Sequence, residues 1–453
     1  MRLEQNQQRD RTSAPGRVPW LVFIFLTAVF LMAFHSLTYA QQVFGPEDSS
    51  SGDVLKNEMS ADVLASQLSG SFAKEIALVS LGMFAVATLI RFRANRSLLI
   101  QGALAWILLG YIGWASCSTL WADDLPLSLK RLMVLWILCI AAAAIVWRLS
   151  LPEIVSWVVF CTGVCLFIGI IASVIYGTFR PWSSGYRFAG ILYPNGEGVE
   201  CAILMLSAVA AGDIHRRWRS FFRAIAFVGF VFLILSGSRT ALSVSLFALL
   251  VYVARVSSRA QKWAAVCGLG LVACVLSLSL ATGPASDLTG ALLLGRDAPG
   301  SVDTFAGRTL VWKEVVKYIA ARPITGYGYG GFWTVKRISM VSEDQEWLVP
   351  DSHSAYIDNL LGLGAVGFIL YCLSLIAGSW RVFSVTRLTQ RPEFAYCMAV
   401  LVFCILQGFL ESDMYVGSFL MFLCMVILCR FAFVPVSSDW KIAAADLMPA
   451  TTL

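Results

Sequence analysis

Long apolar stretches separated by short polar segments recur along almost the whole chain. A helix needs about 20 apolar residues in a row to cross the hydrocarbon core of a bilayer. The sixth to eighth stretches are the shortest, so the pattern defines their ends least sharply. The pattern predicts 12 transmembrane helices, placed at Trp20–Tyr39, Ile76–Ile90, Ser97–Leu120, Leu132–Trp147, Ile154–Ile175, Val199–Ala211, Ala224–Leu235, Ala241–Ala254, Trp263–Ala281, Ala355–Ile376, Phe394–Leu410 and Met414–Phe433.

Composition agrees with this pattern. Of the 453 residues, 58% are hydrophobic and 14% are charged, whereas soluble domains are about half apolar and a quarter charged. The chain is therefore expected to be an all-α polytopic membrane protein with a single integral membrane domain over residues 1–453. The net charge of +6 comes without a basic tract interleaved with aromatics, so nucleic acid is not an expected partner.

The distribution of basic residues predicts the orientation in the membrane. A cytoplasmic N-terminus places four arginine-rich connections on the cytoplasmic side, as the positive-inside rule requires. The acidic segment Gln41–Glu75 then lies outside, and the C-terminus is cytoplasmic. The four connections are Arg91–Arg96, Arg216–Arg223, Arg255–Lys262 and Arg381–Arg391.

The longest polar segment, Thr282–Ser352, joins predicted helices 9 and 10 on the outer side. Loops of this length inside a compact domain are usually functional. Within it, apolar residues of Arg308–Ala320 share one face, and Arg322-Pro323 ends the run. The loop is thus expected to contain a short amphipathic helix that lies on the membrane surface or caps a cavity.

Several basic side chains converge on the predicted outer face. Arginine forks bind phosphate oxygens bidentately, and an arginine between two apolar spans usually faces a polar cavity. Together they suit a pyrophosphate, although Arg239 also fits an interfacial anchor and Arg180 a lipid headgroup contact. The set is Arg180, Arg187, Arg239 and Arg308, with His353 beside them.

Acidic residues near this set have alternative interpretations. Glu197 and Glu200 open a predicted span and either neutralise Arg187 or belong to an active site. Asp123 and Asp124 precede Pro126 and are typical of a solvated helix start.

His353 is one of three histidines and the only one that the topology places outside. An imidazole titrates near ~6.5 and can take a proton from a hydroxyl at neutral pH. It is therefore a candidate general base, or else an ordinary residue at a helix start. No metal site is expected, because there is a single outer histidine and all 12 cysteines lie inside apolar stretches.

The stretch Gly326-Tyr-Gly-Tyr-Gly-Gly-Phe-Trp333 is rich in glycine and aromatic residues. It lacks the strand before it and the Gly-Lys-Ser/Thr ending of nucleotide-binding loops, so no nucleotide cofactor is expected. The side chains of Tyr327, Tyr329 and Trp333 suit contacts with a sugar or a polyprenyl chain, and a purely structural turn fits equally well.

Several motifs, in their order along the chain, resemble those of the O-antigen ligase and polysaccharide polymerase family. The resemblance runs from about Trp114 to Cys429 and includes the Trp121-Ala-Asp-Asp loop. The other motifs are Ser236-Gly-Ser-Arg-Thr-Ala241, Gly307-Arg-Thr-Leu-Val-Trp312, Arg322-Pro-Ile-Thr-Gly-Tyr-Gly-Tyr-Gly-Gly-Phe332, Asp351-Ser-His-Ser-Ala-Tyr-Ile-Asp-Asn359 and Leu363-Gly-Ala-Val-Gly367.

The resemblance implies a fold similar to membrane-embedded glycosyltransferases of the GT-C class, in the bacterial inner membrane. It implies glycan transfer from undecaprenyl pyrophosphate to an acceptor hydroxyl on the periplasmic side, without metal or cofactor. Arg239 and Arg308 would bind the pyrophosphate and His353 would lie near the acceptor or the leaving phosphate, whereas Arg187 matches more loosely.

The chemistry implied is a single inverting displacement. His353 is the candidate base, with Asp351 and Asp358 as alternatives. Asp351, Tyr356 and Asp358 of the same motif are also candidate sugar contacts.

Members of the family either join repeat units or attach finished glycan to the lipid A core. The glycine-aromatic loop leading into Asp-Ser-His favours a polymerase. A chain-length regulator, an export complex and membrane lipids are the expected partners. A transporter or flippase of lipid-linked glycan is the alternative from another class, but the two related halves typical of such proteins are not found in the sequence.

Overall fold

The computed structural model describes residues 72–91, 99–100, 102–183, 186–256, 308–343, 349–415 and 417–435, together with Thr27, Leu31, Ala33 and Phe34. Helices, turns and loops make up these ranges, and no strand occurs within them. The predicted ninth helix, the first part of the long loop (282–307) and most of the first predicted helix lie outside the described residues.

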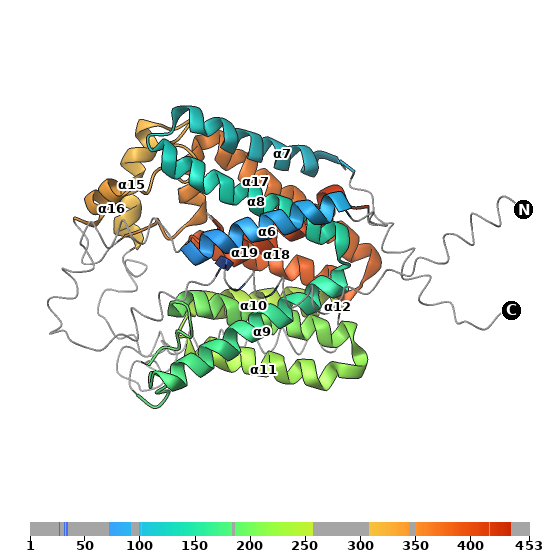
Figure 1. Ribbon diagram of the computed structural model, residues 1–453. Helices are drawn as coiled ribbons and strands as arrows, with labels where there is room; N and C mark the ends of the chain where they lie inside the picture. The colour runs from blue at the N-terminus through green and yellow to red at the C-terminus, as the bar shows by residue number, and fades with distance from the viewer. Residues whose placement is uncertain are drawn as a thin grey trace, which may run out of the picture.

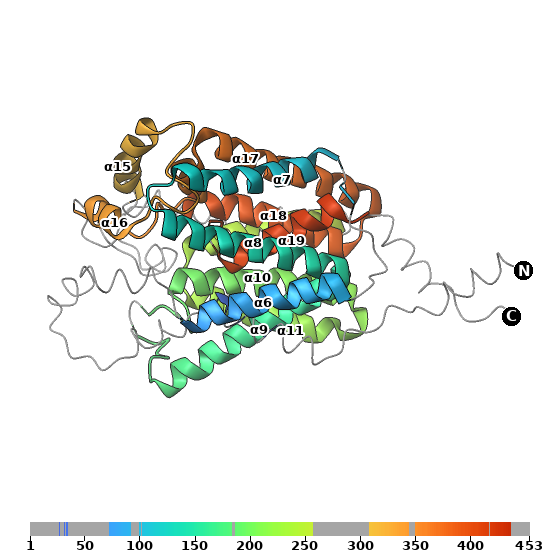
Figure 2. The ribbon, with the colours of Figure 1, turned by 45° about the horizontal axis from the view of Figure 1, so that its top comes forward.

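The helices share one dominant direction, as Figures 1 and 2 show. Ten of the twelve predicted helices correspond to observed ones, and the predicted amphipathic helix corresponds to α15. The elements are α6 (Phe72–Arg91), α7 (Gly102–Cys117), η1 (Ser118–Trp121), α8 (Leu125–Arg148), α9 (Leu151–Ile175), α10 (Pro194–Ile214), η2 (Arg216–Trp218), α11 (Arg219–Leu235), α12 (Arg239–Val256), α15 (Arg308–Ala321), α16 (Val335–Ser342), α17 (Ala355–Thr389), α18 (Pro392–Leu410) and α19 (Phe419–Phe433).

Seven of the described helices are long and apolar enough to cross a membrane: α7 with η1, α8, α9, η2 with α11, α12, α17 and α18. The helix α19 is apolar but shorter. The described part of the chain is therefore all-helical, with helices typical of a membrane protein, and the count of twelve spans stays a prediction.

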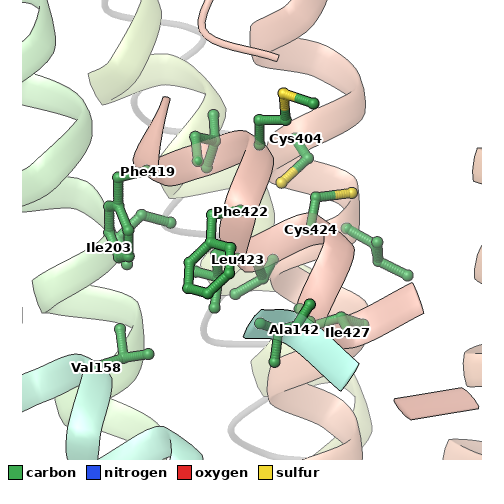
Figure 3. Packing of buried hydrophobic residues seen from close by; sticks show 14 of the residues in the cluster. Ala142, Val158, Ile203, Cys404, Phe419, Phe422, Leu423, Cys424 and Ile427 are labelled. Atoms are coloured by element: carbon green, nitrogen blue, oxygen red, sulfur yellow. The ribbon is translucent and has the colours of Figure 1, made fainter. Parts of the chain in front are cut away.

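The helix α10 lies at the centre of one half of the bundle, in contact with α9, α11, α12 and α18. Small residues make this burial possible. On α11, a methyl group on Gly229 would lie 3.2 Å from the carbonyl oxygen of Cys201, which is tighter than most such contacts, so glycine favours this close approach of the two backbones. Figure 3 shows Phe419 and Phe422 of α19 facing Ile203 of α10 within the same apolar core.

The helices α15 and α16 sit together at one end of the bundle (Figures 1 and 2). Val311 and Val315 bury one face of α15 against a small second core that contains Phe332 and Leu361. This core closes the end of the bundle, which we call the α15 end. The amphipathic helix expected in the long loop thus caps the end of the bundle.

The end of η1 and the loop before α8 are attached to the segments on either side of the glycine-rich loop at the α15 end. Asp123 pairs with Arg322 at 2.6 Å and also with Arg337, and Trp121 donates to the carbonyl of Thr325 at 3.0 Å. Asp124 caps α8 by accepting from the backbone of Leu127, which confirms the predicted helix start.

Two glycines let the chain at the start of the glycine-rich loop contact the backbone of α17. Gly364 interrupts that helix with φ 64° and ψ −167°, and the carbonyl of Pro323 accepts from the Ala365 backbone at 2.8 Å. A methyl group on Gly364 would lie 2.2 Å from the oxygen of Ile324, and one on Gly326 would lie 2.6 Å from the Gly364 nitrogen. The contact therefore requires glycine at both positions.

We expect Gly364→Ala to destabilise the protein by at least about 2 kcal/mol, because the substitution combines a left-handed backbone with a backbone clash. The measurement is the thermal denaturation of the purified protein in detergent. Gly113→Ala in α7 is the control, since a methyl group there meets nothing within 4 Å. Equal melting temperatures for the two variants would contradict the requirement for glycine at position 364.

Candidate functional site

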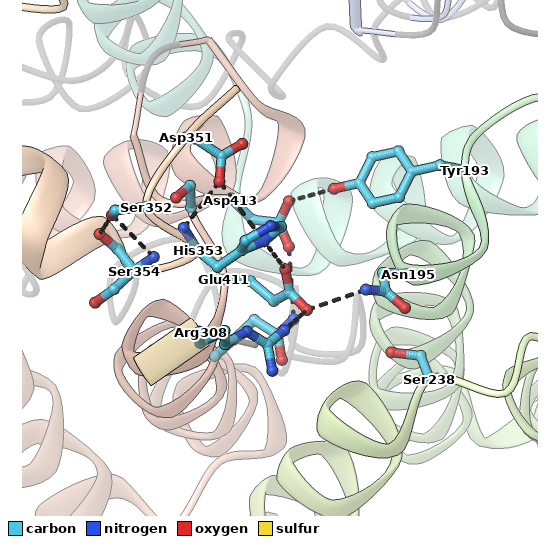
Figure 4. Close-up of polar contacts among 12 residues, drawn as sticks. Tyr193, Asn195, Ser238, Arg308, Asp351, Ser352, His353, Ser354, Glu411 and Asp413 are labelled. Atoms are coloured by element: carbon cyan, nitrogen blue, oxygen red, sulfur yellow. Dashed lines mark hydrogen bonds and ion pairs between the residues drawn. The ribbon is translucent and has the colours of Figure 1, made fainter. Parts of the chain in front are cut away.

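One buried carboxylate collects the polar side chains at the α15 end. Glu411 follows the last residue of α18, and its side chain is 4% exposed. Arg308, the first residue of α15, donates to its Oε1 at 2.6 Å. His353, in the loop before α17, places Nδ1 3.4 Å from its Oε2, as Figure 4 shows. We call this group the Glu411 site. It also includes the neighbouring side chains of Arg187, Asn195, Asp351, Asp358 and Asp413.

A strained loop presents His353 to Glu411. The residue has φ 52°, a left-handed conformation that is uncommon for a residue other than glycine. Its backbone N–H donates to Asp351 Oδ1 at 2.9 Å, and the same carboxylate lies 3.6 Å from Nδ1 of the ring. Local strain that the surroundings hold in place is a frequent property of functional sites.

Asp358 holds this loop in place through hydrogen bonds. Its side chain is buried and accepts from the Trp333 indole at 2.9 Å and from the Ser352 backbone at 3.3 Å. It also accepts from the hydroxyl of Ser412, next to Glu411. The aspartate that the sequence offered as an alternative base thus ties the His353 loop to the Glu411 loop.

A second arm reaches Glu411 from α10. Asn195 donates to Glu411 Oε1 at 3.2 Å and accepts from Arg187 Nη2 at 2.7 Å. Arg187 also donates from Nε to the carbonyl of Ser236 at 3.0 Å. A methyl group on Gly237 would come within 3.0 Å of that Nε. Arg187 therefore lies against the turn from which α12 begins with Arg239.

Charges around His353 shift its titration. Burial alone lowers the pKa of His353, but the hydrogen bond to Glu411 and the charge of Asp351 outweigh burial and raise the pKa above its ordinary value. Asp413, two residues beyond Glu411, accepts from the Tyr193 hydroxyl at 3.0 Å. Burial, followed by the nearby charge of Glu411, raises the pKa of Asp413 to about 7.

This arrangement supplies two chemical capabilities. A carboxylate that accepts from Nδ1 of a histidine orients the ring and makes Nε2 the proton acceptor. Arginines held in place by fixed acceptors are preorganised to stabilise a negatively charged group. Arg308 and His353 share the same carboxylate, so the two capabilities lie side by side.

The structure brings together Arg308, His353 and Asp351 through Glu411, and it adds Arg187 through Asn195. Arg239 is the first residue of α12, and this helix begins just after Ser236, whose carbonyl accepts from Arg187. Arg180 is exposed and donates to the carbonyl of Gly177 at 3.0 Å, and no contact described here connects it to Glu411.

The aromatic residues that were predicted to contact a sugar are packed among other side chains beside the site. Tyr327, Tyr329 and Trp333 are buried, and the Trp333 indole is hydrogen-bonded to Asp358. Tyr356 stacks on Phe409 and donates to a carbonyl of α18. In this structure these rings form the framework of the site.

Glu197 is fully buried in the first turn of α10. Within the described part of the chain, neither of its carboxyl oxygens has a hydrogen-bond partner. Its Oε2 lies 2.6 Å from where a methyl group on Gly190 would be. The structure thus shows no pairing between Glu197 and Arg187.

Three site residues were not predicted from the sequence: Asn195, Glu411 and Asp413. The signal available was Glu411-Ser-Asp413, two acids between two apolar stretches. This pattern is equally typical of a helix boundary and of a functional site.

Comparison with known protein families identifies part of the chain. Residues 224–372 match the family model described as O-antigen ligase. A search of curated proteins finds no match. The matched segment includes Arg239, Arg308 and His353, while Arg187 and Glu411 lie outside it. The resemblance seen in the sequence motifs is confirmed over residues 224–372, which match the O-antigen ligase family model.

Proposed function

We propose that this protein is a polysaccharide polymerase, a glycosyltransferase that uses undecaprenyl-pyrophosphate-linked glycan as donor. The acceptor is the hydroxyl of another lipid-linked repeat unit. The observation that carries the proposal is the shared Glu411 carboxylate, which holds a candidate base, His353, at 3.4 Å and a candidate phosphate ligand, Arg308, at 2.6 Å. The family match over residues 224–372 supports the same class of reaction.

The proposed step is one displacement at the anomeric carbon. Nε2 of His353 takes the proton of the acceptor hydroxyl while the acceptor oxygen forms the new glycosidic bond. The bond to the pyrophosphate breaks, and its electron pair stays on the leaving oxygen. Glu411 stabilises the imidazolium that results. Attack on the side opposite the leaving group inverts the anomeric centre.

Arginines stabilise the leaving group in this scheme. Arg308 has five N–H donors, so it can keep its contact with Glu411 and still donate to phosphate oxygens. Arg187 and Arg239 lie at the turn between α11 and α12 and extend the same positive region. Fixed guanidinium groups in a site screened from water stabilise the charge that develops as the bond breaks. Asp351 and Asp358 act as positioning residues for the His353 loop.

The proposal includes a location. We assign the site to the periplasmic face of a bacterial inner membrane, with both termini cytoplasmic, because the arginine-rich connections then face inward. A chain-length regulator and an export complex are the proposed partners. An O-antigen ligase that transfers glycan to lipid A core is the second candidate, since the matched family carries that description.

Purified protein supplied with synthetic undecaprenyl-pyrophosphate repeat units is expected to form longer glycans, followed by gel or mass analysis. His353→Ala and Arg308→Gln should each lower the rate by about 100-fold or more. Arg217→Gln, a change to an exposed arginine in a connection assigned to the cytoplasmic face, is the control and should elongate normally.

Other outcomes of this experiment decide between the candidates. If wild-type protein does not elongate but transfers glycan once lipid A core is added, it is a ligase. If neither product forms, and the reconstituted protein moves lipid-linked glycan across the vesicle membrane, the protein is a transporter and not a glycosyltransferase.

The pH profile tests the pairing of His353 with Glu411. The neutral ring is the base, and its pKa is raised, so kcat/KM should fall as the pH drops through a value above ~6.5. Glu411→Gln removes a charge that raises this pKa, so the acidic limb should move to lower pH while the rate falls.

Glu314→Gln makes the same chemical change in a residue paired with Lys317 on α15, and its acidic limb should stay in place. If the acidic limb of the pH profile did not move in Glu411→Gln, Glu411 would have no part in the proposed mechanism.

A further inference from the structure

Tyr193 places a partly open aromatic ring beside the Glu411 site. It precedes α10 as its N-cap and is 43% exposed, whereas the rings of the glycine-rich loop are buried. The Tyr193 hydroxyl donates to Asp413 Oδ1 at 3.0 Å. A methyl group on Gly196 would lie 3.0 Å from the ring carbon Cε1, so the ring rests against the first turn of α10. The ring is thus held in one orientation while part of its surface stays accessible.

Hydrogen-bond acceptors predominate around Tyr193. Asp413 accepts from Tyr193 and, at 3.5 Å, from Nε2 of Gln407. Gln407 is fully buried, and within the described part of the chain its Oε1 has no hydrogen-bond partner. The side chain of Asp351, nearby, is 37% exposed. A ligand on this side of the site is therefore expected to supply hydroxyl donors.

Glu411 lies between this acceptor-rich side and a donor-rich side. Figure 4 shows Asp351, Asp413 and Tyr193 on one side of Glu411 and Arg308 on the other. Burial around its hydroxyl, followed by the charges of Asp413, Glu411 and Asp351, raises the pKa of Tyr193, so the three carboxylates act together at this point. They repel a further negative charge, whereas Arg308 attracts one. The Tyr193 side thus suits an uncharged ligand rich in hydroxyls, and the Arg308 side suits a pyrophosphate.

We propose that the Tyr193 side of the site binds the acceptor sugar and that this sugar is uncharged. A C–H face of the sugar packs on the Tyr193 ring, and its hydroxyls donate to Asp413 and Asp351. Asp351 lies 3.6 Å from Nδ1 of His353, so a sugar bound here lies next to the proposed base. The inference rests on the proposed function, because it assigns the second substrate of that reaction.

Saturation-transfer-difference NMR on the full-length protein, in a detergent without a sugar headgroup, measures this binding without turnover. The first probe is the lipid-free repeat-unit oligosaccharide released from the producing cell's own surface polysaccharide. The second is the same oligosaccharide with its primary hydroxyls oxidised to carboxylates. Wild-type protein should bind the first probe about tenfold or more tightly than the second, because an added carboxylate meets like charges.

Two variants separate the ring of Tyr193 from its hydroxyl. Tyr193→Leu should weaken binding of the first probe about fivefold, the effect of one aromatic contact. Tyr193→Phe keeps the ring and should bind within about twofold of wild type. Tyr176→Leu removes another exposed tyrosine, at the end of α9, and should bind as wild type does.

Three results would overturn the proposal: no binding of the first probe to wild type, equal affinity for the two probes, or unchanged affinity in Tyr193→Leu. A loss in Tyr193→Phe as large as in Tyr193→Leu would also overturn it, since the ring would then serve only to hold Asp413. The elongation assay is judged separately. Binding through Tyr193 without elongation removes the polymerase and leaves the sugar subsite, whereas elongation with unchanged binding in Tyr193→Leu removes only the subsite.

Discussion

The geometry of the α15 end depends on a negative charge that is almost completely removed from water. A buried carboxylate costs several kcal/mol unless cations and donors surround it. Glu411 obtains these from Asn195, Arg308 and His353, which lie on three separate segments. Satisfying one side chain therefore draws the starts of α10, α15 and α17 together. The loss of a cationic partner leaves the charge uncompensated, at a cost of roughly 3–5 kcal/mol.

Backbone constraints make this convergence possible. The loop before α17 turns through a left-handed His353, and Asp358 holds that loop to the residue after Glu411. One and a half turns further along α17, Gly364 breaks the helix so that the chain around Ile324 can touch its backbone. Strain at His353 and close contact at Gly364 are both sustained by the surrounding packing, which is how a rigid framework fixes a reactive side chain.

The hydrophobic pattern predicted the helices well because each apolar stretch must be buried in lipid or protein. It failed where a polar side chain within a predicted span caps the start of the helix, so that the helix begins later than predicted. Met414 and Tyr415 extended the predicted last helix, yet α19 begins at Phe419, because Ser418 caps it by accepting from the Met421 backbone. Asp413 therefore lies in a turn before α19 and Met414 and Tyr415 are not part of that helix.

The site was predicted only in part, for a related reason. His353 and Arg308 stand out in the sequence because a titratable ring and an arginine are unusual between apolar segments. Glu411 stands out less, since an acid between two membrane helices is also an ordinary boundary residue. Its role comes from partners as far as 216 positions away in the sequence (195 to 411), and one sequence carries no signal for such a contact.

In the proposed reaction, the pairing of Arg308 with Glu411 keeps the group that would bind the phosphate in place before the ligand arrives. An unopposed guanidinium under the loop would repel a protonated His353 and would attract any available anion. A carboxylate that shares both partners keeps the arginine oriented and the imidazole in one tautomer before substrate arrives. The pyrophosphate of the proposed donor would then meet donors that need little rearrangement, so more of its binding energy would be available to stabilise the transition state.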